Sequence, residues 1–399
     1  MKTPGLALAA AMACLTLSDR PVGAQDQVAE ARSAFQNDVH AGAGLTCVSC
    51  HQASARPAAA PEFAAPRRTD IAPLCAKCHA DAAYMRQFAP QVRVDQLAQY
   101  VTSVHGKRMA AGEDRAATCS DCHGAHGVGR VSDPRSPVAP LNAARTCARC
   151  HEDSARMAAF GRSGTPFADW SSSVHAVALL TRGDTSAPTC NTCHGSHGAT
   201  PPGVTEVAGV CAQCHVREGE LFRKSPKKAL FDAIGQPECL ACHSNHRIEA
   251  PSDAWVGLGK EAVCAACHEE STPGSKTILE VRQGLDGLTR SIAAAESVLT
   301  RAEHAGMLVD EGDGALREAH EHLIHSRVLV HAFAATPLAE TVAPGLLAAQ
   351  RGEQVGVRAL RELERRRRGL AVATVFIVGF LVTLWLKIRR LPASQQEPG

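Results

Sequence analysis

Aromatic residues are scarce in this chain. Phe, Trp and Tyr make up 4% of its 399 residues, with three Trp and two Tyr. Because aromatic side chains usually dominate apolar burial in protein cores, other apolar material must fill part of the interior. The formal net charge is also small, +2 at pH 7. The strongly basic surface of a nucleic-acid-binding protein is therefore not expected.

Cysteine, by contrast, is abundant and regularly spaced: 16 of the 17 cysteines form eight copies of Cys-x-x-Cys-His. The cysteine pairs are Cys47 and Cys50, Cys75 and Cys78, Cys119 and Cys122, Cys147 and Cys150, Cys190 and Cys193, Cys211 and Cys214, Cys239 and Cys242, and Cys264 and Cys267. The histidines that follow them are His51, His79, His123, His151, His194, His215, His243 and His268. This motif attaches a c-type haem through two thioethers, and its histidine is the proximal iron ligand.

Two other interpretations of paired cysteines fit less well. Zinc knuckles also use Cys-x-x-Cys, but zinc gives no reason for a histidine directly after the second cysteine in every copy. Disulfides are disfavoured because cysteines so close in sequence rarely reach bridging geometry. The sequence therefore predicts eight c-type haems, each with an iron. Their porphyrins supply the apolar surface that the rare aromatic residues do not.

The haem motifs fall into four di-haem pairs, at about residues 40–95, 100–165, 170–224 and 225–275. The second and third pairs each open on Ser-Val-His and carry another histidine three residues after the first motif. The first pair has only a leading histidine, and the fourth only a trailing one. Recurrence at matched positions predicts these six as distal axial ligands: His40, His105, His126, His175, His197 and His246.

Eight irons need two further distal ligands. We expect them from the cysteine-free region after residue 275, where His320 and His331 lie about 20° apart on one helical stripe and roughly 16 Å apart along it. The fourth pair has Ser225-Pro226-Lys227 where two other pairs have Ser-Val-His. Lys227 or Lys228 could replace a ligand, but a desolvated neutral amine is costly. We therefore predict that both lysines are surface residues.

Methionine is the competing distal ligand and would raise the reduction potential. Met85 and Met157 each lie six residues after a proximal histidine, in matching segments. Apolar packing against a haem edge explains them as well as ligation does, and we favour packing. Predominantly bis-histidine ligation and low reduction potentials follow.

The N-terminus is typical of a secretory signal. Lys2 precedes an apolar stretch from Leu6 to Leu17, and small residues precede Gln25, which predicts a signal peptide over residues 1–24. The remaining cysteine, Cys14, lies inside it. A lipid anchor at Cys14 is a less favoured alternative, because the leucine usual three residues earlier is absent.

The C-terminal region is expected to be helical over residues 276–369, with Gly312-Asp313-Gly314 separating two helices. Residues 370–386 are apolar between the arginines 365–368 and the cations Lys387, Arg389 and Arg390, which predicts a transmembrane helix over residues 370–388 with snorkelling flanks. An exported N-terminus leaves residues 389–399 as a cytoplasmic tail. The predicted fold is mostly α with much irregular loop: a haem-dominated region at 25–275, then these helices and one anchor.

The pattern Ser-x-His, Cys-x-x-Cys-His-Gly-x-His-Gly and a second Cys-x-x-Cys-His resembles the doubled-motif multihaem cytochromes, including the cytochrome c3-like family, over residues 40–270. In such proteins stacked haems carry electrons between redox partners, and most irons are closed to substrate. The resemblance implies as partners a membrane quinol dehydrogenase or b-type cytochrome and periplasmic cytochromes or reductases. Hydroxylamine oxidoreductase-like enzymes share the haem count and a C-terminal helical region.

Two classes of function compete. One is an electron-transfer protein on the periplasmic side of the cytoplasmic membrane. The other is an oxidoreductase acting on a small nitrogen or sulfur compound at one open haem. The nitrite-reducing relatives have lysine in place of a motif histidine, and no such motif occurs here. Tyr84 and Tyr100, the only tyrosines, do not match the tyrosine that hydroxylamine-oxidising relatives cross-link to haem. Electron transfer is therefore the favoured interpretation, and no catalytic residue is assigned.

Direct quinol oxidation by this chain alone is a third possibility. The arginines 365–368 would hold haems near the membrane surface, but no quinone pocket is readable from the sequence. We expect a separate donor.

Overall fold

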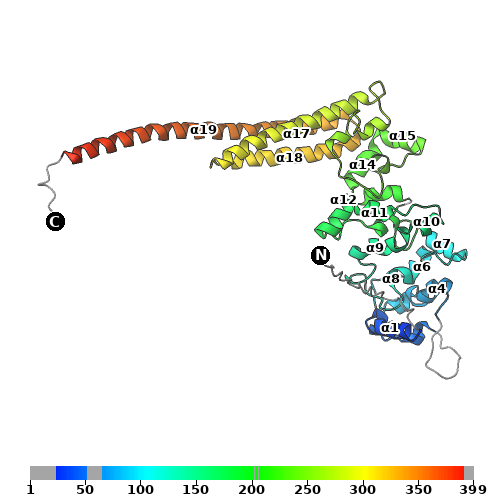
Figure 1. Ribbon diagram of the computed structural model, residues 1–399. Coiled ribbons are helices and arrows are strands. Elements are labelled where there is room, and N and C mark those ends of the chain that lie inside the picture. Colours follow the sequence, from blue (N-terminus) through cyan, green and yellow to red (C-terminus); the bar gives the residue numbers. More distant parts are fainter. Residues whose placement is uncertain (1–23, 52–64, 202, 205, 391–399) are drawn as a thin grey trace, which may run out of the picture. The chain divides into compact units, whose positions relative to one another are not determined.

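The computed structural model describes residues 24–51, 65–201, 203–204 and 206–390 (Figure 1). Residues 1–23 of the predicted signal and residues 391–399 of the predicted tail lie outside them. The described residues form helices joined by irregular loops, with no strand. The predicted fold class is confirmed.

The chain divides into two compact units. The first comprises Met1–Ala168 and His175–Pro202, and the second comprises Asp169–Val174 and Gly203–Gly399. The first unit holds the first five haem motifs. The second holds the last three motifs and all of the cysteine-free C-terminal helices.

Short helices make up the first unit. They are α1 Ala24–Gln36, α2 Val39–Gly42, α3 Cys47–Cys50, α4 Arg68–His79, α5 Ala82–Met85, α6 Gln96–Tyr100, α7 Val104–Ala110, α8 Cys119–His123, α9 Pro140–His151, α10 Ser154–Ala158, η1 Val177–Thr181 and α13 Cys190–His194. Two more, α11 Pro166–Ser171 and α12 Val174–Ala176, contain the residues at which the chain passes between the units.

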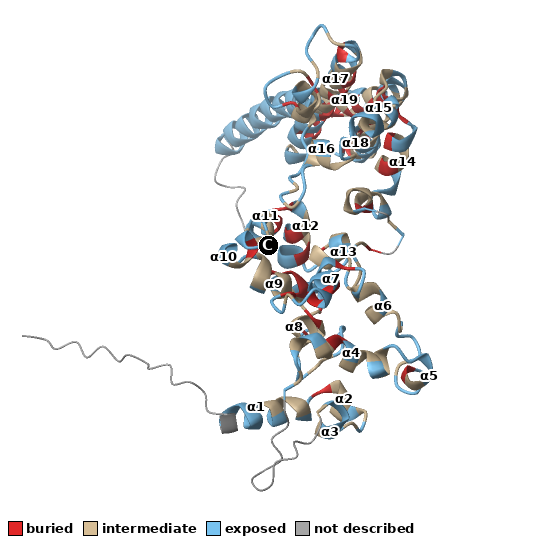
Figure 2. Ribbon diagram, turned by 90° about the vertical axis from the view of Figure 1, so that its right-hand side faces the viewer, coloured by how far each residue is buried: buried red, intermediate tan, exposed pale blue. Residues whose placement is uncertain are grey.

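The first unit has little side-chain core of its own. Its buried apolar residues, among those coloured red in Figure 2, are mostly alanine. A few larger side chains, such as Leu179 and Met109, are also buried. Met85 and Met157, which we predicted to pack, are 9% and 8% exposed. Burial of apolar surface stabilises a fold by about 25 cal/mol per Å². Alanine side chains are small, so an interior lined with them buries little apolar surface. This composition suits a unit whose apolar filling comes from porphyrins.

The second unit begins with short helices and ends in long ones. They are η2 Val207–Gln213, α14 Val216–Lys224, α15 Pro226–Ile234, α16 Leu240–His243, η3 Asp253–Trp255, η4 Val263–Ala266, α17 Ser275–His304, α18 Asp310–Leu329, η5 Val330–Ala332 and α19 Ala335–Arg389. Figure 1 shows α17, α18 and the first part of α19 side by side as a bundle.

The bundle has a conventional apolar core with Leu285, Leu288 and Leu338 at its centre. Its helix break differs from our prediction. The chain turns at residues 305–309, where Gly306 adopts φ +78°, whereas Gly312 lies inside α18. A Cβ on Gly312 would come within 2.3 Å of Leu299 Cδ2, so Gly312 permits close helix packing rather than a turn.

Glycines of α19 serve the same purpose. A Cβ on Gly345 would lie 2.7 Å from His322 Cβ, and one on Gly356 would lie 2.6 Å from Val298 Cγ1 and 3.1 Å from the backbone nitrogen of Leu299. His322 is consequently half-buried. Close approach of the backbones replaces bulky side-chain packing along this contact.

The last part of α19 extends away from its partners with an apolar surface. Every residue from 364 to 390 is exposed, including Phe376 at 74% and Leu370 at 68% (pale blue in Figure 2). This helix is the one among the described residues that is long and apolar enough to cross a membrane. Of the four preceding arginines, Arg365 and Arg366 pair with Glu362, and Arg368 pairs with Glu364.

We expect Gly356→Ala to destabilise the bundle by about 1–3 kcal/mol, because overpacking against the α17 backbone forces the helices apart. The measurement is thermal unfolding of the full chain in detergent, followed by far-ultraviolet circular dichroism. Gly314→Ala is the matched control. Its Cβ meets only Arg317 Nη2 at 3.8 Å, so better helix propensity should leave stability unchanged or raise it by about 0.5–1 kcal/mol. Equal loss in both variants would contradict the close-packing role.

Candidate haem centres

The first motif of each pair forms a short helical turn, in α3, α8, α13 and α16, whereas the motifs at Cys75 and Cys147 end the longer helices α4 and α9, and those at Cys211 and Cys264 begin in the 3-10 turns η2 and η4. Helical backbone brings the two cysteines of a motif to one face because residues three apart are neighbours on a helix. Three first motifs share a backbone cap: the N–H before the first cysteine donates to the side chain three residues on. The bonds are Thr46 to Ser49 at 3.1 Å, Thr118 to Asp121 at 2.7 Å and Thr189 to Thr192 at 3.2 Å. The polar residue inside each of these motifs therefore shapes the turn.

A residue with positive φ follows the first motif in three of the pairs and changes the direction of the chain. Gly124 and Gly195 have φ values of +86° and +80°, and Ser244 takes the same place in the fourth pair at +63°. Each precedes a trailing histidine by two residues: His126, His197 and His246. The reversal carries those histidines away from their own motif.

Neighbouring motifs touch through their cysteines. The thiols of consecutive motifs lie close enough to interact where one pair meets the next: Cys75 with Cys119, Cys147 with Cys190, and Cys211 with Cys239. Within pairs, the second cysteines are close enough to interact electrostatically, as in Cys50 with Cys78 and Cys122 with Cys150. The motifs within each unit therefore follow one another in space as they do in sequence.

Four motif histidines of the first unit each face one predicted distal histidine. The pairs and their ring-centroid separations are His40 with His79 at 5.9 Å, His51 with His126 at 5.9 Å, His105 with His151 at 6.1 Å, and His123 with His197 at 6.1 Å. A leading histidine thus faces the second motif of its own pair. A trailing histidine faces the first motif of the pair before it.

These separations fit an iron held between two imidazoles. A histidine nitrogen binds a metal at about 2 Å, which places two ring centroids on opposite sides of one ion roughly 6 Å apart. One ring in each pair belongs to a Cys-x-x-Cys-His motif, whose thiols attach haem. The donor set and its spacing therefore fit c-type haem.

Burial keeps most of these rings in the form that binds metal. Desolvation lowers the pKa of His79, His105, His123, His151, His197, His243 and His268. A lower pKa favours neutral imidazole, whose lone pair is free for iron. His40 is further oriented by Asp38, whose Oδ1 lies 2.8 Å from Nδ1, so that Nε2 is left for the metal.

In the second unit, His331 comes from outside the repeats and faces a motif histidine. Its ring lies 6.1 Å from that of His243 at an interplanar angle of 16°. His331 Nδ1 donates to the Val328 carbonyl oxygen at 2.9 Å, which leaves Nε2 for iron. Our expectation for His331 thus has a geometric basis.

His320 lies elsewhere. Its Nε2 is 2.9 Å from Glu296 Oε1 across the bundle, and its side chain is 44% exposed. The shared stripe we used required one helix through both histidines, but α18 ends at Leu329 and His331 lies in the following turn. The structure therefore brings His331, and not His320, to a motif histidine.

Lys227 contradicts our expectation of a surface lysine. It is half-buried, and its Nζ lies 2.7 Å from His268 Nε2. The signal for this contact was the Ser-Pro-Lys segment at the leading position of the fourth pair. The remaining predicted ligands, His175 and His246, keep their assignment from the repeats alone. His175 follows Ser173, which is fully buried.

Loops of the last pair are fixed to the bundle through Asp253. Its carboxylate accepts two hydrogen bonds from Arg327 at 2.9 Å each, and its carbonyl oxygen accepts one from Arg282 at 2.8 Å. The Arg327 guanidinium holds the pKa of this carboxyl below its ordinary value. Because Asp253 opens the turn that carries Trp255 against His243, the bundle positions both sides of that haem centre.

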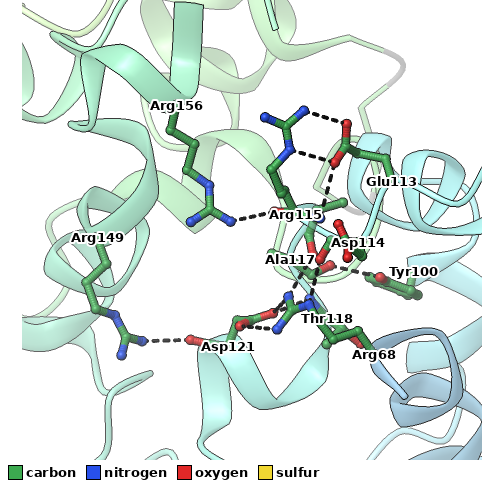
Figure 3. Close-up of polar contacts among 11 residues, drawn as sticks. Arg68, Tyr100, Glu113, Asp114, Arg115, Ala117, Thr118, Asp121, Arg149 and Arg156 are labelled. Carbon is green, nitrogen blue, oxygen red and sulfur yellow. Dashed lines mark hydrogen bonds and ion pairs between the residues drawn. The ribbon is translucent and has the colours of Figure 1, made fainter. Parts of the chain in front are cut away.

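A polar network holds three consecutive motifs of the first unit (Figure 3). Arg68 of α4 pairs with Asp121 of α8 at 2.6 Å, and Arg149 of α9 donates to the Asp121 carbonyl oxygen at 2.7 Å. Tyr100 donates to the Ala117 carbonyl oxygen at 2.8 Å. Charge-assisted hydrogen bonds of this kind are directional, so they help to set the spacing of the motifs.

Comparison with known proteins identifies one family. The family model described as cytochrome c3 matches residues 39–152 and 184–269, about half of the chain and including all eight motifs. No curated protein and no solved structure matches significantly.

The pairing of His126 with His51 predicts which iron opens when His126 is lost. His126→Ala should produce one high-spin ferric haem in electron paramagnetic resonance. Adding Cys47→Ser and Cys50→Ser should abolish this signal, because the opened haem is attached there. Cys119→Ser with Cys122→Ser is the matched control and should leave it. Loss of the signal in the control instead would assign His126 to its own motif and contradict the pairing.

Proposed function

This chain belongs to the cytochrome c3 family, and we propose that it is a membrane-anchored octahaem cytochrome c of the periplasm. It passes electrons between a quinol-linked membrane donor, such as a quinol dehydrogenase or b-type cytochrome, and periplasmic cytochromes or reductases. The succession of cysteine contacts from motif to motif carries this proposal, because electron transfer needs cofactors in close series.

Haem supplies a one-electron couple between ferric and ferrous iron when it is bound. The motif cysteines would attach it, and the motif histidines and the donors that face them would hold its iron. Six motif histidines face a second nitrogen donor in the structure: five face histidine and His268 faces Lys227. Irons capped on both faces leave no position for a substrate, which favours electron transfer over catalysis.

The exposed apolar end of α19 supports the anchor. Thioether attachment of haem takes place on the exported side of the bacterial cytoplasmic membrane, so the haem motifs belong in the periplasm and the segment after Ile388 in the cytoplasm. The arginines 365–368 then lie at the outer surface. Arg367 has no ion pair with a described residue, and arginines here suit anionic lipid headgroups.

The test of electron transfer is a reductive titration of the purified full chain. We expect it to take up about eight electrons per chain reversibly and to show low-spin haem only, with cyanide and nitric oxide binding poorly. About one high-spin haem per chain in the untreated protein would contradict a closed electron carrier. Reduction of nitrite or hydroxylamine at that haem would then support the enzymatic alternative.

Haem load is tested separately. The intact mass after acid–acetone extraction should exceed that of the polypeptide after residue 24 by eight haem masses, because thioether-bound haem does not extract. Zinc, or haem that passes into the acetone, would refute covalent attachment. Serine at both cysteines of one motif should lower the count by one.

A further prediction concerns the anchor. The full chain should stay with membranes through a high-salt wash, because apolar insertion is not screened by ions. A chain ending before Gly369 should be released as a soluble haem protein. Release of the full chain by salt would make the C-terminal segment a peripheral helix.

A further inference from the structure

Lys227 and its neighbour Lys228 lie in contrasting surroundings. Lys228 Nζ pairs with Asp232 at 2.6 Å and with Glu238 at 3.2 Å, as surface lysines do. Lys227 forms no ion pair with a described residue, and its amine faces the imidazole nitrogen of His268 instead. An ammonium group normally donates its hydrogen bonds to the oxygens of carboxylates or water, so a lysine amine placed against an imidazole nitrogen is unusual.

The backbone places Lys227 where other pairs have a distal histidine. In three pairs a buried residue caps a short helix, and the donor lies two residues later. Asp38, Ser103 and Ser225 are these caps, at 4%, 6% and 8% exposure, and each accepts a backbone N–H of its helix. The donors are His40, His105 and Lys227.

Each donor then faces the second motif of its own pair. His40 faces His79 and His105 faces His151, while Lys227 faces His268. The lysine thus occupies the distal position of the repeat and differs from the others only in its donor group.

His268 is oriented for a ligand on the Lys227 side. Its Nδ1 lies 3.3 Å from Thr272 Oγ1, and the hydrogen bond from this nitrogen leaves the lone pair on Nε2. The ring lies over Gly274, where a Cβ would come within 3.5 Å of Cε1. His268 follows Cys267, so this Nε2 is the proximal nitrogen of the haem attached there.

An iron between the two nitrogens needs roughly 4 Å, from two bonds of about 2 Å. The amine, at 2.7 Å from Nε2, must therefore withdraw by somewhat more than ~1 Å when haem is attached. The four-carbon stem of lysine has the rotational freedom to do so.

An aromatic ring lies beside the amine. The Phe333 ring centroid lies 5.9 Å from Lys227 Nζ, and Phe222 packs against Phe333 with centroids 6.2 Å apart. Phe333 is held at φ +50° directly after the turn that carries His331. The ring beside the amine is therefore held by the same stretch of chain that brings His331 to His243.

We propose that Lys227 is the distal axial ligand of the haem attached at Cys264 and Cys267, opposite His268. The proposal rests on haem attachment at this motif and replaces His320 in our ligand set. The last haem of the chain is then the one with amine and imidazole ligands, and it lies in the unit that carries the anchor.

The test uses the full-length holoprotein in detergent. The oxidised wild-type protein should show, in near-infrared magnetic circular dichroism, one amine–imidazole charge-transfer band beside those of bis-imidazole haems. Lys227→Ala should lose this band and gain a high-spin resonance that integrates to about one haem per chain. Lys227→His should lose the band without gaining high-spin haem, since a second imidazole closes the iron. Lys228→Ala, the matched control, should match the wild type.

Absence of the amine–imidazole band from the wild-type protein would overturn the proposal without any variant. An unchanged, fully low-spin spectrum in Lys227→Ala would overturn it as well. The mass-based haem count separates this failure from failure of the proposed function. If the wild type carries eight haems but lacks the amine–imidazole band, only the assignment of Lys227 as a ligand is wrong. If the haem at Cys264 and Cys267 is missing, haem attachment at this motif is wrong.

Discussion

Each iron needs a second nitrogen donor from a stretch of chain other than the one that attaches its porphyrin, and this requirement governs the architecture. A motif supplies two thiols and one imidazole from a single helical turn. The opposite face of the haem must be reached by a segment that returns from a distance. In the first unit, His126 and His197 make this return and face motif histidines of the preceding pair, so contacts between histidine rings link each of the first three pairs to the next.

That rule explains where the repeat runs out. The first pair needs no trailing histidine, because no earlier pair awaits one. The first motif of the fourth pair has no later pair to serve it, and His331 of the bundle faces His243 instead. The Asp253 contacts with Arg327 and Arg282 hold the bundle in register for this task. The bundle, which has an apolar core of its own, thereby holds the side chain that faces the motif histidine of the fourth pair.

The two units consequently depend on different forces. The bundle is stabilised by leucine packing and by glycines that let helices approach, such as Gly312 and Gly356. The first unit buries mainly alanine and is organised by directed polar contacts such as Arg68 with Asp121. Its apolar filling is the porphyrin, so loss of one haem should loosen neighbouring motifs more than loss of a side chain would.

The sequence alone predicted the haem attachment sites, because Cys-x-x-Cys-His is a local motif of five residues. It also predicted the apolar helix at the end of α19, because an uninterrupted apolar stretch can be recognised without knowing what packs against it. Matched positions in the repeats also predicted most distal donors. Tertiary structure decided which donor meets which motif, since those partners lie tens of residues apart. It places Lys227, and not His320, against a motif histidine for a physical reason: the cap at Ser225 turns the lysine toward His268, while α18 ends before His331 and leaves His320 facing Glu296.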